Sequence, residues 1–129
     1  MAGFKFWEHP HEEWRDVRGY PDYEVSNMGR VRSYRQPGRP GHILSARYKK
    51  RWGYYQVVLL NREKLVHVLV AEAFLDERPL GHEVNHIDGK KTNNAASNLE
   101  WVTRSENLRH AYALGLRTPR KSKLVGATT

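Results

Sequence analysis

The sequence predicts an α+β protein in which an N-terminal antiparallel β module is followed by a small β-β-α unit. Two patterns carry this prediction. Up to Lys64, short apolar stretches with period-two alternation are separated by turn-forming residues, which is typical of antiparallel strands. After Lys64 the apolar spacing becomes that of a helix, and a strand, a polar loop, a second strand and a second helix follow. The 129 residues suffice for one compact domain or for two half-sized modules that share a core.

The N-terminal half is predicted to contain short strands after a loose leader over residues 1–13. The predicted strands are residues 23–25, 30–32, 42–45 and 54–60, where β-branched and aromatic side chains are frequent. The predicted turns and loops are residues 19–22, 27–29, 35–41 and 61–64, each of which contains glycine, proline or asparagine.

The C-terminal half begins with a helical pattern. Val66, Val70 and Phe74 recur at helical spacing, so we expect a helix that starts near Leu65 and ends at residues 78–81. The strands that follow are predicted at residues 83–87 and 99–102, on either side of a polar loop over residues 88–97.

A second helix is predicted directly after the last strand. Residues 103–106, Thr-Arg-Ser-Glu, have the form of a capping box, in which the threonine caps the helix and the glutamate reaches back to it. This helix should run to about Leu114, where Gly115 stops it. Residues 117–129 carry four basic and no acidic side chains and are expected to form a flexible tail.

The charge of the chain indicates a polyanionic partner. The formal net charge is +8, and residues 25–62 alone hold nine basic side chains and no acidic one. Because these basic side chains are concentrated in one segment, they favour a dedicated surface that binds nucleic acid or an anionic membrane over a role in general solubility.

Composition also excludes several kinds of site. The chain has no cysteine, which rules out disulfides, thiolate zinc sites and a cysteine nucleophile, so no structural zinc is expected. No apolar run approaches the ~18–20 residues that a membrane-spanning helix needs, and residues 1–14 do not read as a signal peptide. The expected location is therefore the cytoplasm.

The residues with the clearest chemistry lie between positions 85 and 107. Packing the strand that ends in Asn85 and His86 against the final helix can bring both residues into one crevice with Asn107. Carboxamide oxygens suit a hard divalent cation such as Mg²⁺ or Mn²⁺. A neutral imidazole beside such an ion is a plausible base for activating water. Taken alone, His86 could also be a structural core histidine and Asn107 a solvent-facing polar residue.

Two runs of residues resemble one family. Residues 83–111, EVNHIDGKKTNNAASNLEWVTRSENLRHA, resemble the HNH endonucleases, also called ββα-metal or His-Me finger nucleases. Residues 12–33, EEWRDVRGYPDYEVSNMGRVRS, resemble the nuclease-associated modular domain that precedes the homing branch of this family, and residues 66–75 resemble the helix between the two. The resemblance covers residues 12–114.

The resemblance implies a role for each site residue. His86 would be the general base, Asn107 a metal ligand, and Asn98 a structural support that ties the loop together and holds the strand of His86. Asn85 stands where the family often has a metal-binding aspartate, so we expect weak metal binding until a DNA phosphate completes the site. His110 could be a further ligand, a phosphate contact or a surface residue. The implied cofactor is one divalent cation, Mg²⁺ or Mn²⁺, with no small-molecule cofactor.

The resemblance also divides the chain and names its partner, double-stranded DNA. Residues 1–64 would read DNA, residues 65–116 would cleave it, and residues 117–129 would be the basic tail. Expected DNA contacts are Arg30, Arg32, Arg35, Lys49, Lys50, Arg51, Lys90, Lys91 and Arg104. His67 could be a cap, a packing residue or part of the crevice, and Trp52 could pack or stack on DNA.

The predicted function is a metal-dependent HNH endonuclease of the homing type, which hydrolyses phosphodiester bonds in double-stranded DNA. One such site cuts one strand at a time, so a monomer should nick. The resemblance further implies a gene carried by a phage or an intron in a bacterial host. The alternatives are a non-catalytic DNA-binding protein with a degenerate site and, supported only by charge and aromatic content, an RNA-binding protein.

Overall fold

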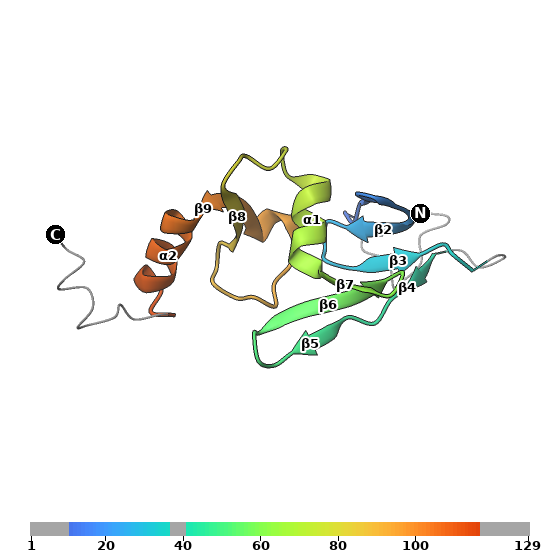
Figure 1. Ribbon diagram of the computed structural model, residues 1–129, viewed down its shortest axis with the longest axis horizontal. Helices are drawn as coiled ribbons and strands as arrows, with labels where there is room; N and C mark the ends of the chain where they lie inside the picture. Colours follow the sequence, from blue (N-terminus) through green and yellow to red (C-terminus); the bar gives the residue numbers. More distant parts are fainter. Residues whose placement is uncertain (1–10, 37–40, 117–129) are drawn as a thin grey trace.

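Three small antiparallel sheets and two α-helices form the part of the chain that the computed structural model describes, residues 11–36 and 41–116 (Figure 1). The first sheet has the order β1 (Trp14–Val17), β2 (Tyr20–Ser26), β3 (Val31–Ser33) and β4 (His42–Ile43). The second has the order β5 (Arg47–Lys49), β6 (Tyr54–Leu59) and β7 (Arg62–Leu65). The tail expected over residues 117–129 and most of the leader lie outside the described residues.

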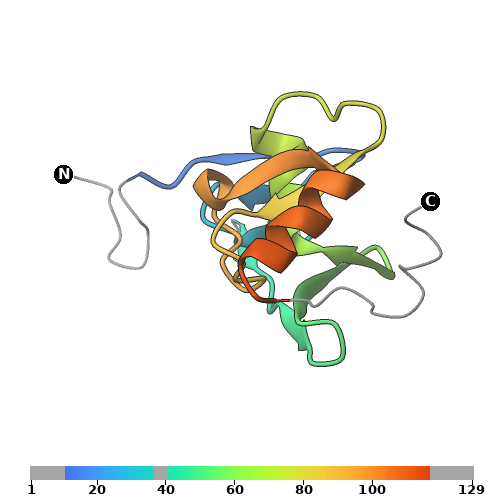
Figure 2. The ribbon, with the colours of Figure 1, turned by 90° about the vertical axis from the view of Figure 1, so that its left-hand side faces the viewer.

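The β-β-α unit follows these sheets. Helix α1 (Val66–Phe74) leads to the hairpin of β8 (His82–His86) and β9 (Leu99–Thr103), whose connecting loop ends in a 3₁₀ turn (Ala96–Asn98). Helix α2 (Arg104–Ala113) packs on both strands of this hairpin, as the view in Figure 2 shows. The predicted fold class, an antiparallel β module followed by a β-β-α unit, is confirmed.

One hydrophobic core joins the two halves of the chain. Helix α1 lies at its centre and contacts β1, β2, β6 and β9. The buried apolar residues of this core are Val17, Tyr23, Val25, Val31, Val57, Leu59, Val66, Leu69, Val70, Ala71 and Leu99. Because α1 is short and has no side-chain cap, its stability comes mainly from this packing.

The first hairpin differs from its prediction. Its turn is formed by Arg18 and Gly19, and β2 already begins at Tyr20, so the turn predicted at residues 19–22 is wrong. Pro21 is tolerated in β2 because the register with β1 shifts there, and its missing N–H interrupts no ladder bond. Strands β1 and β5 were not predicted, and β4 is shorter than the predicted 42–45.

The second sheet corrects another turn. Residues 61–64 were predicted as a turn, but Leu60 and Asn61 form it, with φ values of 49° and 67°. This two-residue connection with positive φ at both positions is a favoured hairpin turn, and β7 follows it directly. Helix α1 ends at Phe74, earlier than the predicted 78–81.

The predicted capping box of α2 is confirmed. The Thr103 hydroxyl accepts a hydrogen bond from the Glu106 N–H at 3.2 Å, and the Glu106 carboxylate accepts one from the Thr103 N–H at 2.8 Å. Gly115, with φ +73°, follows the helix end as expected. Neither helix in the described ranges is long and apolar enough to cross a bilayer.

Candidate active site

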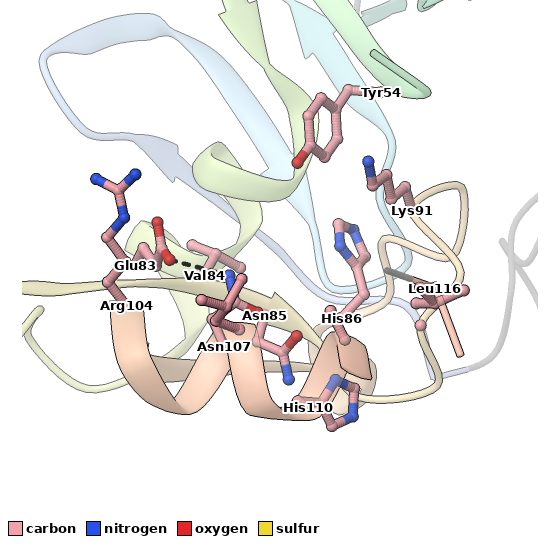
Figure 3. Close-up of a pocket in the computed structure, with 13 residues that line it drawn as sticks. Tyr54, Glu83, Val84, Asn85, His86, Lys91, Arg104, Asn107, His110 and Leu116 are labelled. Carbon is pink, nitrogen blue, oxygen red and sulfur yellow. Dashed lines mark hydrogen bonds between the residues drawn. The ribbon is translucent and has the colours of Figure 1, made fainter. Parts of the chain in front are cut away.

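A cleft of about 480 Å³ lies between β8, the loop after it and α2 (Figure 3). It takes Tyr54 from β6, residues 83–86 from β8, Lys91 from the loop, and Arg104, Asn107 and His110 from α2. Asn85, His86 and Asn107 therefore line one cleft, whereas Asn98 supports it from the loop. The lining thus combines cationic side chains with imidazoles, two carboxamides and the Glu83 carboxylate.

His86 is held as a neutral imidazole. It is the last residue of β8 and only 6% exposed, and its Nε2–H donates to the Asn94 Oδ1 at 2.8 Å. With Nε2 carrying the proton, Nδ1 keeps its lone pair and has no hydrogen-bond partner among the described residues. Burial lowers the pKa of His86, and Lys91 lowers it further, against the opposing effects of the Asn94 hydrogen bond and Asp88. His86 is thus unprotonated at neutral pH.

Two aromatic rings back His86. The His67 ring stacks on Tyr54 with centroids 4.8 Å apart and lies 4.9 Å from the His86 ring. Burial, together with the neighbouring His86 and Lys91, lowers the pKa of His67 to about 4. Its Nδ1 is buried with no partner among the described residues, and the cap position of α1 belongs to Leu65. His67 is therefore a neutral packing residue behind His86 rather than a helix cap.

Asn98 ties together the loop after β8. Its Oδ1 accepts from the Asp88 N–H at 3.0 Å, while its Nδ2 donates at 2.9 Å to both the Asp88 carboxylate and the Asn93 carbonyl. Asp88 also accepts from the Asn93 side chain and the Lys90 N–H, and these hydrogen bonds lower its pKa to about 2. Asp88 therefore shapes the loop and does not face the cleft as a ligand.

Asn94, the partner of His86, was missed by the sequence reasoning. It is only 7% exposed and packs against the turn of Gly29, where an added Cβ would lie 3.2 Å from the Asn94 Cβ. The same loop donates from the Ala96 N–H to the Asn27 carbonyl at 2.8 Å. The N-terminal turn thus supports the residue that orients His86, a contact across some 65 positions that no local pattern signals.

The two candidate ligand carboxamides are both held by glutamates. Asn85 Nδ2 donates to the Glu100 carboxylate at 2.7 Å, and Asn107 Nδ2 donates to the Glu83 carboxylate at 3.0 Å. Their Oδ1 atoms accept no hydrogen bond from the described residues. Glu83 and Glu100 were not predicted, although the pairing of Asn85 with Glu100 across the hairpin was a signal that could have found Glu100.

One ring nitrogen of His110 is already used in a hydrogen bond. Its Nε2–H donates to the Ile87 carbonyl at 3.0 Å, which joins α2 to the end of β8. The described residues contain no group of three or more His, Cys, Asp or Glu side chains that could hold a metal ion. The carboxamide oxygens of Asn85 and Asn107 therefore stay the predicted donors for a cation here.

The basic residues fall into two groups. Arg30 and Arg32 both lie over the Trp14 ring, and they form ion pairs with Glu12 and Glu24 respectively. Lys49 likewise pairs with Glu63 at 3.2 Å.

The second group lies at or near the cleft. Lys50 and Arg51 are exposed in the β5–β6 turn beside the exposed Trp52, and Lys90 is exposed in the loop after β8. Arg35, which follows β3, is exposed as well but does not line the cleft. Lys91 donates to the Trp52 carbonyl and lies over the Tyr54 ring, which brings the β5–β6 turn to the mouth of the cleft. Arg104 lines the cleft from α2.

Two family models match the chain, the NUMOD4 motif over residues 12–59 and the HNH endonuclease over residues 64–109. The chain belongs to the HNH endonuclease family. The resemblance read from the sequence is thereby confirmed. This HNH chain is 37% identical over 108 residues to the DNA endonuclease I-HmuI of Bacillus phage SP01, covering 80% of this chain and 59% of that protein.

Other HNH proteins agree with this assignment. An uncharacterized HNH endonuclease of Acanthamoeba polyphaga mimivirus is 35% identical over 116 residues, which is 87% of this chain and 33% of the relative. The chain thus spans about a third of the mimivirus relative and less than two thirds of I-HmuI. A solved structure of I-HmuI, an HNH homing endonuclease that binds and cleaves DNA, matches with a TM-score of 0.72 at 34% identity, covering 89% of this chain and 66% of that one.

Proposed function

We propose that this HNH chain is a DNA endonuclease that hydrolyses phosphodiester bonds in double-stranded DNA, with His86 as the general base. The observation that carries the proposal is the state of His86, a neutral buried imidazole whose Nε2 is occupied by Asn94 and whose Nδ1 is left as a base beside a cleft. The similarity to I-HmuI, which binds and cleaves DNA, supports the same activity.

The reaction is a hydrolysis. His86 Nδ1 accepts a proton from the water whose oxygen attacks phosphorus, so that a P–O bond forms and the bond to the 3′ oxygen breaks. The imidazolium then carries the proton, which it can return to solvent after the 3′ oxygen has taken a proton and left. The products are a 5′-phosphate and a 3′-hydroxyl end. Burial keeps His86 neutral, which readies it to accept the proton.

The donor set fits one hard divalent cation, Mg²⁺ or Mn²⁺. Asn85 and Asn107 each present a carboxamide oxygen that no described residue uses, and oxygen is the donor such cations prefer. These two residues would hold the ion, which when bound supplies charge neutralisation at the phosphate and the leaving oxygen. His110, already bonded to Ile87, is the weaker candidate ligand.

DNA would approach across the cleft mouth and the β5–β6 turn. Lys91 and Arg104 line the cleft, Lys90 precedes Lys91 in the same loop, and Lys50 and Arg51 extend the cationic surface. Arg30, Arg32, Arg35 and Lys49 are proposed contacts as well, although three of them already pair with carboxylates. Because such contacts release counterions from DNA, affinity should fall steeply with salt concentration.

A plasmid-relaxation assay tests the proposal. Supercoiled DNA is incubated in Mg²⁺, Mn²⁺ or EDTA with the parent protein, with His86→Ala, and with His42→Ala as a matched control on the exposed strand β4. We expect metal-dependent conversion to open circles by the parent and the control, and its loss in His86→Ala. One site per chain should nick rather than linearise. Intact DNA binding without cleavage, on plasmid and on the DNA of the source genome, would instead favour a non-catalytic DNA-binding protein, which the neutral Asn85 also favours.

A further inference from the structure

The proposed cation site lacks a charged ligand of its own, yet it is bordered by two carboxylates. Asn85 and Asn107 offer only carboxamide dipoles to a divalent ion. Each of their Nδ2 groups is bonded to a glutamate, Glu100 at 2.7 Å and Glu83 at 3.0 Å. No carboxylate other than these two accepts a hydrogen bond from a candidate ligand in the described ranges.

These hydrogen bonds fix the direction of the carboxamide oxygens. Nitrogen and oxygen diverge from the same carbon of a planar group, so a bound Nδ2 leaves Oδ1 on the opposite side. Asn85 is only 6% exposed and lines the cleft, and its Oδ1 has no donor among the described residues. The Asn85 Oδ1 is not among the buried side-chain atoms without a partner, so it is accessible from the cleft, and a carboxamide oxygen accessible there is a suitable donor for a hard divalent cation.

The hairpin register builds this arrangement. Asn85 pairs directly with Glu100 in the antiparallel β8–β9 ladder, so their side chains share one face. Glu83 lies two residues before Asn85, on the same face of the hairpin. Helix α2 covers this face, and Asn107 on α2 donates to Glu83. The two Asn–Glu pairs thus stand next to each other between the hairpin and α2, as Figure 3 shows for Glu83, Asn85 and Asn107.

We propose that Glu100 and Glu83 are positioning residues of the cation site, which aim the Asn85 and Asn107 oxygens at the ion and supply the negative charge that these ligands lack. The inference rests on the proposed metal-dependent function. It predicts that the chain binds a divalent cation without DNA more tightly than the neutral Asn85 alone leads us to expect, because the two glutamates offset part of the charge of the ion.

Mn²⁺ binding to the full chain, followed by the EPR signal of free Mn²⁺ without DNA, tests the proposal. Glu100→Gln keeps an oxygen that can accept from Asn85 Nδ2 but removes the charge. The double variant Asn85→Asp with Glu100→Gln restores the charge and the hydrogen bond with donor and acceptor exchanged. Glu83→Gln, alone and with Asn107→Asp, repeats the test on the second pair, and Glu63→Gln on exposed β7 removes the same charge elsewhere.

We expect measurable Mn²⁺ binding to the parent and to the control Glu63→Gln. Glu100→Gln and Glu83→Gln should each bind Mn²⁺ at least about fivefold more weakly, since a nearby charge acts strongly at a partly buried site. Each double variant should recover the affinity. Thermal melts should show all variants folded. In ¹⁵N spectra, Mn²⁺ should broaden the Asn85 and Asn107 side-chain signals of the parent.

Three results would overturn the proposal: unchanged affinity in both single variants, exchanged pairs as weak as the single variants, or no Mn²⁺ binding by the parent at millimolar concentration. If the parent then still nicked plasmid in a metal-dependent way, the proposed function would stand and only the role of the glutamates would be lost.

Discussion

Acid should destabilise this protein through His67, and the size of the effect follows from its burial. His67 is 6% exposed, stacks on Tyr54 and has an Nδ1 without a partner among the described residues. These surroundings lower its pKa from 6.5 to about 4. The folded state therefore holds His67 neutral in a pH range where the unfolded chain would protonate it.

The sign and magnitude follow from proton linkage. Between the two pKa values the unfolded state binds more protons, so the free energy of unfolding falls as the pH drops from 6.5 towards 4. The full contribution is about 3 kcal/mol, and about 2 kcal/mol of it is lost between roughly pH 7.5 and pH 5. That loss is a large part of the stability of a small domain.

The decisive variant is His67→Phe, which keeps a ring against Tyr54 and removes the titrating group. Urea unfolding followed by tryptophan fluorescence and circular dichroism, repeated across this pH range, gives the free energy of unfolding if the two probes coincide. The parent should lose about 2 kcal/mol more than His67→Phe. His42→Gln, on exposed β4, should follow the parent. Equal losses in the parent and His67→Phe would refute the reasoning, whatever the absolute stability of the variant.

Further predictions concern the loop, the turn and the base. Asn94→Ala removes the acceptor of the His86 Nε2–H, so single-turnover nicking should fall by about 10- to 100-fold while circular dichroism shows an intact fold. Asn98→Ala removes three hydrogen bonds and should lower the free energy of unfolding by about 2–3 kcal/mol in urea titrations. Gly29→Ala, at φ +89° and pressed against Asn94, should lower both stability and nicking; a variant as active and stable as the parent would contradict the contact. Because burial lowers the pKa of His86 and the base must be unprotonated, the acid limb of the pH–rate profile should lie below pH 6.5; a limb above it would count against His86 as a buried base.

The β-β-α unit could be predicted because its signals are local. The Thr103–Glu106 capping box, the apolar face of α1 and the polar loop before Leu99 each occupy a few consecutive residues. The capping box places the start of α2, and with it Asn107, opposite β8. The approach of Asn107 to Asn85 and His86 then follows from packing the helix on the hairpin.

The errors in the N-terminal half have a common origin. β7 is an edge strand whose first two residues are exposed and whose first three are charged. Its sequence therefore lacks the apolar alternation of a strand and resembles a polar turn. Leu60 gives no turn signal, yet it adopts a positive φ in the hairpin, and its N–H donates to the Tyr23 hydroxyl at 3.3 Å. Tertiary contacts decided this turn, which composition could not show.

The positioning of His86 could not be predicted, because it depends on contacts between distant parts of the chain. Asn94 lies between His86, whose proton it fixes, and the turn of Gly29, where an added Cβ would be tightly placed at 3.2 Å from Asn94 atoms. Ser26 stabilises that turn by accepting from the N–H groups of Met28 and Arg30. The N-terminal motif therefore also supports the β-β-α unit. Its turn forms one wall of the loop that orients His86, so the β-β-α unit alone would keep the imidazole and lose the support that holds Asn94 against it.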